Sequence, residues 1–96
     1  MPNSNDTRAD RLRRLLTERF APEALDVIDE SARHIGHAGA RPEGETHYHI
    51  RMIAAAFAGQ NRLQRQRAVY AALAEEFRNG MHALTLDLRA PGEAAE

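Results

Sequence analysis

The sequence predicts an α+β domain with the element order α-β-β-α-α-β, built as a three-stranded mixed sheet with helices packed on one face. Apolar residues recur every three or four positions near the start of the chain and again in its second half, which predicts the helices. Short segments of alternating or β-branched residues predict the strands. Helices connect the second and third strands, so we expect that pair to be parallel, whereas the first two strands are joined by a loop and should be antiparallel.

The first helix is expected over about residues 10–19. Its apolar stripe has the spacing of one buried helix face and consists of Leu12, Leu15, Leu16 and Phe20. Thr7 or Asp6 can cap its first turn, with support from Asp10. Pro22 is expected to end the helix because the residue before a proline is disfavoured in the α conformation.

Two strands are expected next, over residues 25–29 and 46–54. The loop of about sixteen residues between them is too long for a tight hairpin, and loops of that length are usually functional or disordered. Alternation in the second strand places on the core face the residues Tyr48, Ile50, Met52 and Ala54. The opposite face then carries His47, His49 and Arg51.

A second helical region is expected over residues 62–78, where Asn61 and Gln64 resemble a capping box at its start. Its apolar stripe consists of Leu63, Val69, Tyr70, Leu73 and Phe77. A break near Arg65–Arg67 would divide the region into a short helix and a longer one, which is a helix-turn-helix outline. The Asn79–Gly80 pair is expected to end the region because glycine suits the left-handed residue after a helix.

The third strand is expected over residues 82–88, and the residues after it carry no apolar stripe. We therefore expect one domain over residues 9–90, a disordered N-terminus at 1–8 and a disordered tail at 91–96. The chain of 96 residues has a hydrophobic fraction of 43%, which suffices for a single core.

Composition and motifs argue against several classes of function. No apolar run approaches the roughly 20 residues that cross a bilayer, and the N-terminus lacks the apolar core of a signal peptide, so we expect a cytoplasmic protein without a membrane segment. The net charge of −1 provides no global attraction to nucleic acid. No Ser-His-Asp or Cys-His constellation and no glycine-rich phosphate loop can be assembled, so we do not expect an enzyme.

Histidine is concentrated in one part of the chain and cysteine is absent: four of the five histidines lie in the sixteen residues from His34 to His49. Neutral imidazole is the commonest protein metal ligand, and histidines on a loop can converge on one ion. Strand alternation sets His47 and His49 aside as surface residues and leaves His34 and His37 as candidates. A chain without thiolates cannot hold an iron–sulfur cluster alone, so another molecule would have to supply sulfur. A loop that binds zinc, or no metal, is the simpler alternative.

Four segments resemble signature stretches of the BolA family: 27–31 (Val-Ile-Asp-Glu-Ser), 44–48 (Gly-Glu-Thr-His-Tyr), 69–76 (Val-Tyr-Ala-Ala-Leu-Ala-Glu-Glu) and 81–84 (Met-His-Ala-Leu). The resemblance covers roughly residues 9–91 and keeps the order of the motifs. It implies a fold like the class II KH domain, which agrees with the predicted order of elements. It also implies partnership with monothiol glutaredoxins of the Cys-Gly-Phe-Ser type, in which a shared 2Fe–2S cluster serves iron–sulfur trafficking or iron sensing.

The resemblance also implies which residues of this chain would hold the cluster. In such a heterodimer the glutaredoxin cysteine and glutathione supply thiolates, so the isolated chain is expected to bind no cluster. By position in the Met-His-Ala-Leu motif, His82 is the first ligand; His34 matches the loop ligand, and His37 is its competitor. Replacing thiolate by imidazole removes negative charge from a cluster and raises its potential.

Bacterial members of the family are also described as DNA-binding transcriptional regulators that affect cell shape, and this is the alternative function. The candidate residues surround the expected break between helices: Asn61, Arg62, Gln64, Arg65 and Arg67. The arginines would contact phosphates, and the two amides would add polar contacts. We expect a monomer or a weak homodimer when no partner is bound.

Two departures from the family pattern bear on these expectations. The family usually has Arg-His-Arg before its long helix, and Gln66 stands here at the histidine position, so no role of that histidine carries over. Classical KH domains clamp nucleic acid with a Gly-x-x-Gly loop. The matching turn begins at Gly59 but has Arg62 in place of the second glycine, which weakens an RNA-binding interpretation.

Overall fold

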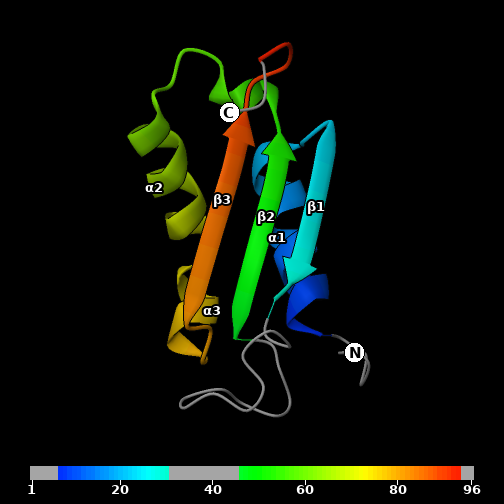
Figure 1. Ribbon diagram of the computed structural model, residues 1–96, viewed down its shortest axis with the longest axis vertical. Helices are drawn as coiled ribbons and strands as arrows, with labels where there is room; N and C mark the ends of the chain where they lie inside the picture. Colours follow the sequence, from blue (N-terminus) through cyan, green and yellow to red (C-terminus); the bar gives the residue numbers. More distant parts are fainter. Residues whose placement is uncertain (1–6, 31–45, 94–96) are drawn as a thin grey trace.

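The structure is a computed structural model that describes residues 7–30 and 46–93 (Figure 1). It has the α+β fold that the sequence predicts. The elements, in chain order, are α1 (Arg8–Phe20), β1 (Ala24–Asp29), β2 (His47–Ile53), the 3-10 helix η2 (Ala55–Phe57), α2 (Arg62–Ala72), α3 (Ala74–Arg78) and β3 (Ala83–Arg89). In these two stretches of chain, none of the helices has the length and apolar character to cross a membrane.

The three strands form one mixed sheet in the order β1-β2-β3. β1 and β2 are antiparallel, with Val27 opposite Ile50, whereas β2 and β3 are parallel, with Ile50 opposite Leu86. Both pairings confirm the prediction. β2 and β3 are parallel because the chain crosses from one to the other through α2 and α3. Figure 1 shows the helices together behind the sheet, so they cover one of its faces.

The core lies between this face of the sheet and the helices. The alternation predicted for β2 is confirmed, since the core-facing residues are at most 2% exposed: Tyr48, Ile50, Met52 and the following Ala54. The fully buried residues on the helical side include Leu12, Leu16 and Val69, together with Leu73 between α2 and α3. The sheet is therefore held by aliphatic packing on one face, while polar side chains of β2 occupy the other.

α1 begins with a capping box. The Thr7 hydroxyl accepts a hydrogen bond from the Asp10 N–H, and the Asp10 carboxylate accepts one from the Thr7 N–H. The helix ends at Phe20, and its C-cap residue Ala21, just before Pro22, has a φ of 46°, in the left-handed region. The predicted cap and stop are confirmed, and the helix starts two residues earlier than expected.

The second helical region breaks at a different place from the one predicted. Arg65–Arg67 lies inside α2, and the chain departs from helical geometry at Leu73. Arginine and glutamine are good helix formers, and the Asn61–Gln64 capping box is present, so α2 continues through that stretch. The predicted helix-turn-helix break is therefore wrong.

The apolar stripe predicted for this region is only partly buried. Val69 and Leu73 are fully buried, but Leu63 is 53% exposed and Tyr70 is 42% exposed. Leu63 lies six positions before Val69, about 240° around the helix, so the two cannot share one face. Tyr70 stacks on Phe77 with ring centroids 5.4 Å apart, and its hydroxyl donates to the Leu84 carbonyl.

The described residues extend beyond the expected 9–90 at both ends. Thr7 and Arg8 belong to the start of α1, and Arg8 is buried at 8% exposure. Of the expected tail, the structure describes residues 91–93, where Glu93 accepts a hydrogen bond from the Ala90 N–H. Residues 1–6 and 94–96 lie outside the described residues.

Candidate functional site

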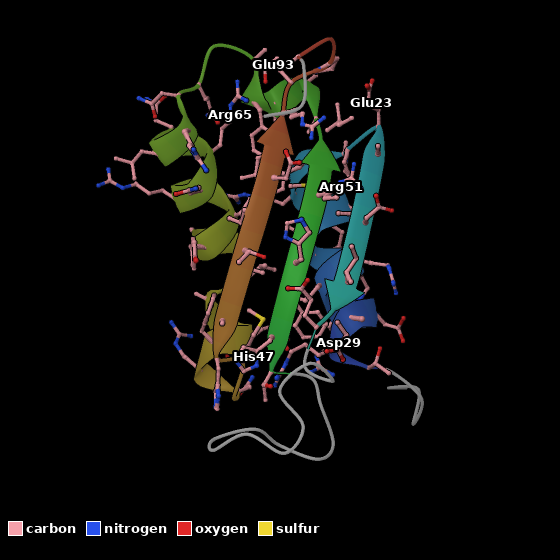
Figure 2. The ribbon with its side chains drawn as sticks, viewed as in Figure 1. Glu23, Asp29, His47, Arg51, Arg65 and Glu93 are labelled. Atoms are coloured by element: carbon pink, nitrogen blue, oxygen red, sulfur yellow. The ribbon has the colours of Figure 1, made fainter. Side chains whose placement is uncertain are left out.

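The candidate residues lie at the two opposite ends of the sheet: Figure 2 shows His47 and Asp29 at one end and Arg65 and Glu93 at the other. The first end, here called the histidine end, holds the last residues of β1 and the first residues of β2 and β3. The second, the arginine end, holds the last residues of β2 and β3 and the first turn of α2.

The histidine end contains His82, the first ligand candidate, immediately before β3. Its side chain is exposed, whereas its backbone is fixed by the neighbouring strand. The Thr46 carbonyl accepts hydrogen bonds from both the His82 N–H (2.8 Å) and the Ala83 N–H (3.1 Å). The two other candidates, His34 and His37, lie outside the described residues.

His47 also lies at this end, beside His82. The ring centroids are 6.0 Å apart and the ring planes form an angle of 76°. Strand alternation correctly places His47 on the face opposite Tyr48, but it says nothing about the neighbouring strand. Because β2 and β3 run parallel with His47 opposite Ala83, His82 comes next to Thr46 at the start of the two strands, within reach of the His47 ring. The surface position expected for His47 agrees with this placement, and the parallel pairing of β2 and β3 adds His82 as its neighbour.

The side chains of the two outward-facing β2 histidines are both held by threonine. The His47 Nδ1 shares a hydrogen bond with the Thr46 hydroxyl (2.8 Å), and the His49 Nδ1 shares one with the Thr85 hydroxyl (2.6 Å). Thr46 is 3% exposed, so one buried residue orients the His47 ring and also anchors the His82 backbone. His49 lies two residues further along β2.

An ion-pair network lies next to the turn that leads into His82. Glu76, 4% exposed, accepts hydrogen bonds from Arg8 (Nε, 2.9 Å) and from Arg11 (Nε and Nη2, both 3.0 Å). Arg8 also donates to the Asn79 carbonyl at 2.7 Å. Burial raises the pKa of Glu76, but the hydrogen bonds from Arg11 and Arg8 outweigh it, so this pKa lies below its ordinary value of 4.5.

The same network fixes the backbone before β3. Gly80 has a φ of 112°, which confirms its expected role at the end of the helical region. The Met81 N–H donates to the Glu76 carbonyl at 3.0 Å. The position of His82 is thus set from both sides, by Thr46 on β2 and by the α3 turn.

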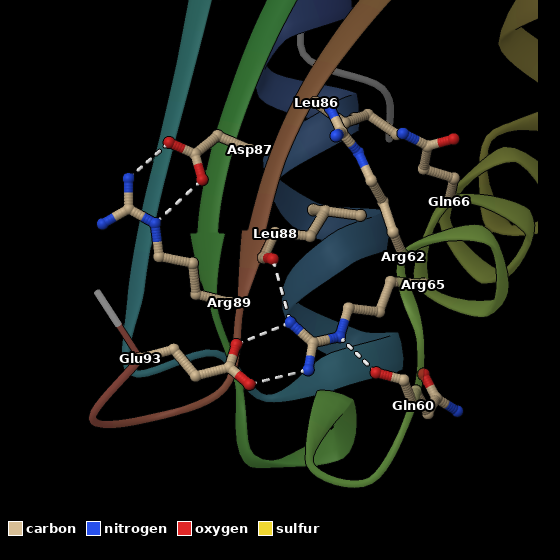
Figure 3. A pocket seen from close by; sticks show the side chains of 9 residues that line it. All are labelled: Gln60, Arg62, Arg65, Gln66, Leu86, Asp87, Leu88, Arg89 and Glu93. Carbon is tan, nitrogen blue, oxygen red and sulfur yellow. Dashed lines mark hydrogen bonds and ion pairs between the residues drawn. The ribbon is translucent and has the colours of Figure 1, made fainter. Parts of the chain in front are cut away.

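The arginine end contains a pocket of about 450 Å³ between α2 and β3 (Figure 3). It is lined by Gln60, Arg62, Arg65, Gln66, Leu86, Asp87, Leu88, Arg89 and Glu93. The Arg65 guanidinium donates to the Gln60 carbonyl (3.0 Å) and the Leu88 carbonyl (3.2 Å). Its other edge makes a bidentate pair with the Glu93 carboxylate, at 2.6 and 2.9 Å.

Two of the arginines that line this pocket, Arg65 and Arg89, pair with carboxylates of the same chain. The hydrogen bond from Arg65 and that from the Ala90 N–H lower the pKa of Glu93 to about 2. Arg89 makes two hydrogen bonds to Asp87 and holds the pKa of that carboxyl below its ordinary value. Both carboxylates are therefore ionised near neutral pH, and both pairs persist there.

The residues proposed from the sequence for nucleic-acid contact occupy different environments. Asn61 and Gln64 bond to each other's backbone N–H in the capping box, so their side chains serve the helix start. Arg62 lines the pocket, and Arg65 is 12% exposed in its pair with Glu93. Arg67 is exposed on α2. All five residues belong to α2 or its N-cap, and two of them, Arg62 and Arg65, line the pocket.

The fold and these motifs define a BolA-like domain. The family model described as BolA-like protein matches residues 16–93, and the chain belongs to this family. The element order and strand pairing are compatible with the class II KH-like topology expected from the sequence.

Relatives cover most of the chain. An uncharacterized protein of the cobS 5′ region of Sinorhizobium sp is 46% identical over 79 residues, which cover 81% of this chain and 85% of the relative. The chloroplastic protein BOLA1 of Arabidopsis thaliana is 37% identical over 91 residues, and human BolA-like protein 1 is 40% identical over 85 residues. These matches cover 93% and 88% of this chain, but only 57% and 59% of the two longer proteins.

Solved structures confirm the fold. The BolA domain of SufE1 from Arabidopsis thaliana has a TM-score of 0.81 at 34% identity, covering 98% of this chain and all of that chain. BolA1 from the same plant has a TM-score of 0.81 at 35% identity, covering 98% of both chains. A domain of this fold is therefore found both in BolA1 and as a domain of SufE1.

Proposed function

We propose that this chain is a non-catalytic partner of a monothiol glutaredoxin of the Cys-Gly-Phe-Ser type, with which it shares a bridging 2Fe–2S cluster. The glutaredoxin cysteine and glutathione hold one iron, and His82 with His34 or His37 holds the other. The observation that carries the proposal is the exposed imidazole of His82 on a fixed backbone, in a cysteine-free BolA-family chain. Such a chain offers imidazole but needs a partner for thiolate.

The residues at the histidine end fit this role. Cluster ligands must keep their position while a partner approaches, and the two hydrogen bonds to Thr46 and the ordered α3 turn hold the His82 backbone. β1 ends and β2 begins at this end, so Glu30 and Thr46, the described residues on either side of the histidine-bearing stretch, lie at the same end of the sheet as His82. A bound cluster would supply electron transfer or iron release. The role of this chain would be to bind the partner and to hold its exposed imidazoles in a fixed orientation.

The test is a titration of cluster-loaded glutaredoxin, with glutathione present, by this chain, followed by visible absorption and circular dichroism. The wild type should change the cluster spectrum, and His82→Ala should abolish that change. His49→Ala is the matched control, since it removes an imidazole two residues into the sheet, and it should behave as the wild type. If His82→Ala still changes the spectrum as the wild type does, the ligand assignment is wrong.

The same titration decides between the two segment histidines. His34→Ala and His37→Ala are compared singly, and only the ligand variant should shorten the lifetime of the shared cluster. Equal lifetimes in both variants and the wild type would contradict a ligand from this segment.

A second candidate function is DNA binding, favoured by the arginine-lined pocket between α2 and β3. The exposed Arg67 and the pocket residue Arg62 would contact phosphates, while Arg65 would have to exchange Glu93 for a phosphate. The net charge of −1 and the internal pairs of Arg65 and Arg89 oppose tight binding.

Fluorescence anisotropy with a labelled duplex at several salt concentrations tests this candidate. Arg62→Ala with Arg67→Ala should weaken binding to all sequences and reduce the salt slope by ~1 per lost phosphate contact. Glu93→Gln should strengthen binding, because a neutral amide replaces the carboxylate that competes with phosphate for Arg65. Binding that is absent in the wild type and in Glu93→Gln would exclude this function for the pocket.

A further inference from the structure

We propose that His47 and His82 form a binding site for one divalent first-row transition-metal ion, of which Zn²⁺ is the simplest probe. The site belongs to the chain by itself, with no glutaredoxin, glutathione or cluster. The two imidazoles project from the starts of neighbouring parallel strands, with ring centroids 6.0 Å apart.

This separation is close to that of two imidazoles on one ion. A Zn–N bond of about 2.0–2.1 Å places each ring centroid about 3.2 Å from the ion, so a tetrahedral angle gives a centroid separation of about 5.2 Å. The observed separation exceeds this by less than 1 Å. His82 is exposed, so a small rotation of its side chain closes the difference without moving the fixed backbone.

Thr46 supplies the outer support that imidazole ligands normally have. A metal-bound histidine usually donates its other ring N–H to a neighbouring acceptor, which fixes the ring and its tautomer. The Thr46 hydroxyl lies 2.8 Å from the His47 Nδ1, which leaves Nε2 as the ligating atom when Nδ1–H donates. The Thr46 carbonyl also holds the His82 and Ala83 N–H groups, so one residue positions both ligands.

The donor set selects the class of ion. Neutral imidazole suits zinc, copper, nickel and iron, whereas magnesium and calcium prefer oxygen ligands. Within residues 7–30 and 46–93, the structure contains no group of three or more side chains placed to hold a metal. Two imidazoles occupy two of the four positions of a tetrahedral ion, so the proposed site has room for external ligands such as a thiolate.

The assignment is independent of the proposed function. It pairs His82 with a β2 residue of the described fold instead of a histidine of the 31–45 segment. Failure of the glutaredoxin experiment leaves it standing, and its own failure leaves the cluster proposal standing.

Calorimetric titration of the full chain with Zn²⁺, in a buffer that does not chelate, is the experiment. One ion should bind, and His47→Ala and His82→Ala should each weaken binding at least ~10-fold, as should Thr46→Val, in the range measured for outer supports of metal ligands. His49→Ala should leave the affinity within about 2-fold, because it removes an equivalent threonine-bonded imidazole that lies further along the strand.

Imidazole nitrogen chemical shifts of the wild type provide a second measurement that needs no variant to fold. Zn²⁺ should shift the His47 and His82 resonances together and at one stoichiometry, and it should leave those of His49 in place. The site is overturned if the chain binds no Zn²⁺, or if His47→Ala binds as the wild type does. It is also overturned if the double variant His34→Ala, His37→Ala loses binding while His47→Ala keeps it.

Discussion

The two ends of the sheet use polar side chains in opposite ways. At the histidine end, backbone hydrogen bonds and a buried ion pair fix the chain, and the imidazole of His82 remains exposed at the surface. At the arginine end, Arg65 and Arg89 are each neutralised by a carboxylate of the same chain. The comparison shows that Arg65 and Arg89 have structural partners within the chain, whereas the His82 imidazole is exposed where the backbone is held by other residues.

The ion pair at the histidine end should make the largest single contribution among these polar groups. We expect Glu76→Gln to lower the free energy of unfolding by about 3 kcal/mol, because removing one partner of a buried pair leaves the other charge uncompensated. Arg8, 8% exposed, would lose its carboxylate. Urea unfolding followed by circular dichroism measures the change.

Glu75→Gln is the matched control for this prediction. Glu75 is adjacent in sequence, but it pairs with Arg78 at the surface, with side-chain exposures of 67% and 71%. An exposed pair of this kind contributes about 0.5 kcal/mol or less. Equal effects of the two substitutions would show that burial of the Glu76 network does not stabilise the histidine end.

The Glu76 contribution should also depend on pH. The pKa of Glu76 is lowered in the folded protein, so folding favours its ionised form. Its stabilisation is present above the ordinary value of 4.5 and is lost as the pH falls through the lowered pKa. The difference in unfolding free energy between the wild type and Glu76→Gln should therefore be constant near neutrality and shrink in acid. A difference that stays constant down to pH 3, or grows, would contradict the assignment.

The elements that could be predicted from the sequence depend on local patterns. The leucine stripe of α1 and the alternation of β2 describe which side of an element is apolar, and packing against one core confirms both. The two capping boxes join residues three positions apart and were readable for the same reason. The break at Leu73 was not readable, because no glycine or proline marks it.

The missed site features join residues that are distant in sequence. Arg8 and Glu76 are 68 positions apart, and Arg65 and Glu93 are 28 apart, so no local spacing predicts either pair. His47 and His82 become neighbours only through the parallel pairing of β2 and β3. The family motifs identified His82, whereas the placement of His47 beside it required the register of the sheet.

At the arginine end, we expect Arg65→Lys to lower the free energy of unfolding by about 1–2 kcal/mol, because lysine cannot reproduce a planar fork that bonds several acceptors. Arg65 donates to two carbonyls and to Glu93, whereas Arg67 is exposed. Arg67→Lys is the control and should stay within about 0.5 kcal/mol of the wild type. The amide resonances of His82 and Ala83 should not move in Arg65→Lys, and movement there would show that the two ends are coupled.

The smallest effects separate the two ends through their helix caps. Thr7→Ala removes the capping side chain of α1 and Asn61→Ala that of α2, and each should cost about 1 kcal/mol of stability. Their local consequences should differ, since α1 begins beside the Glu76 network and α2 begins beside the pocket. Hydrogen exchange should be faster near Glu76 and Met81 in Thr7→Ala, and near Arg65 in Asn61→Ala. If both variants accelerate exchange equally at both ends, the domain opens as one unit. The two ends would then differ in their side chains but not in their local stability.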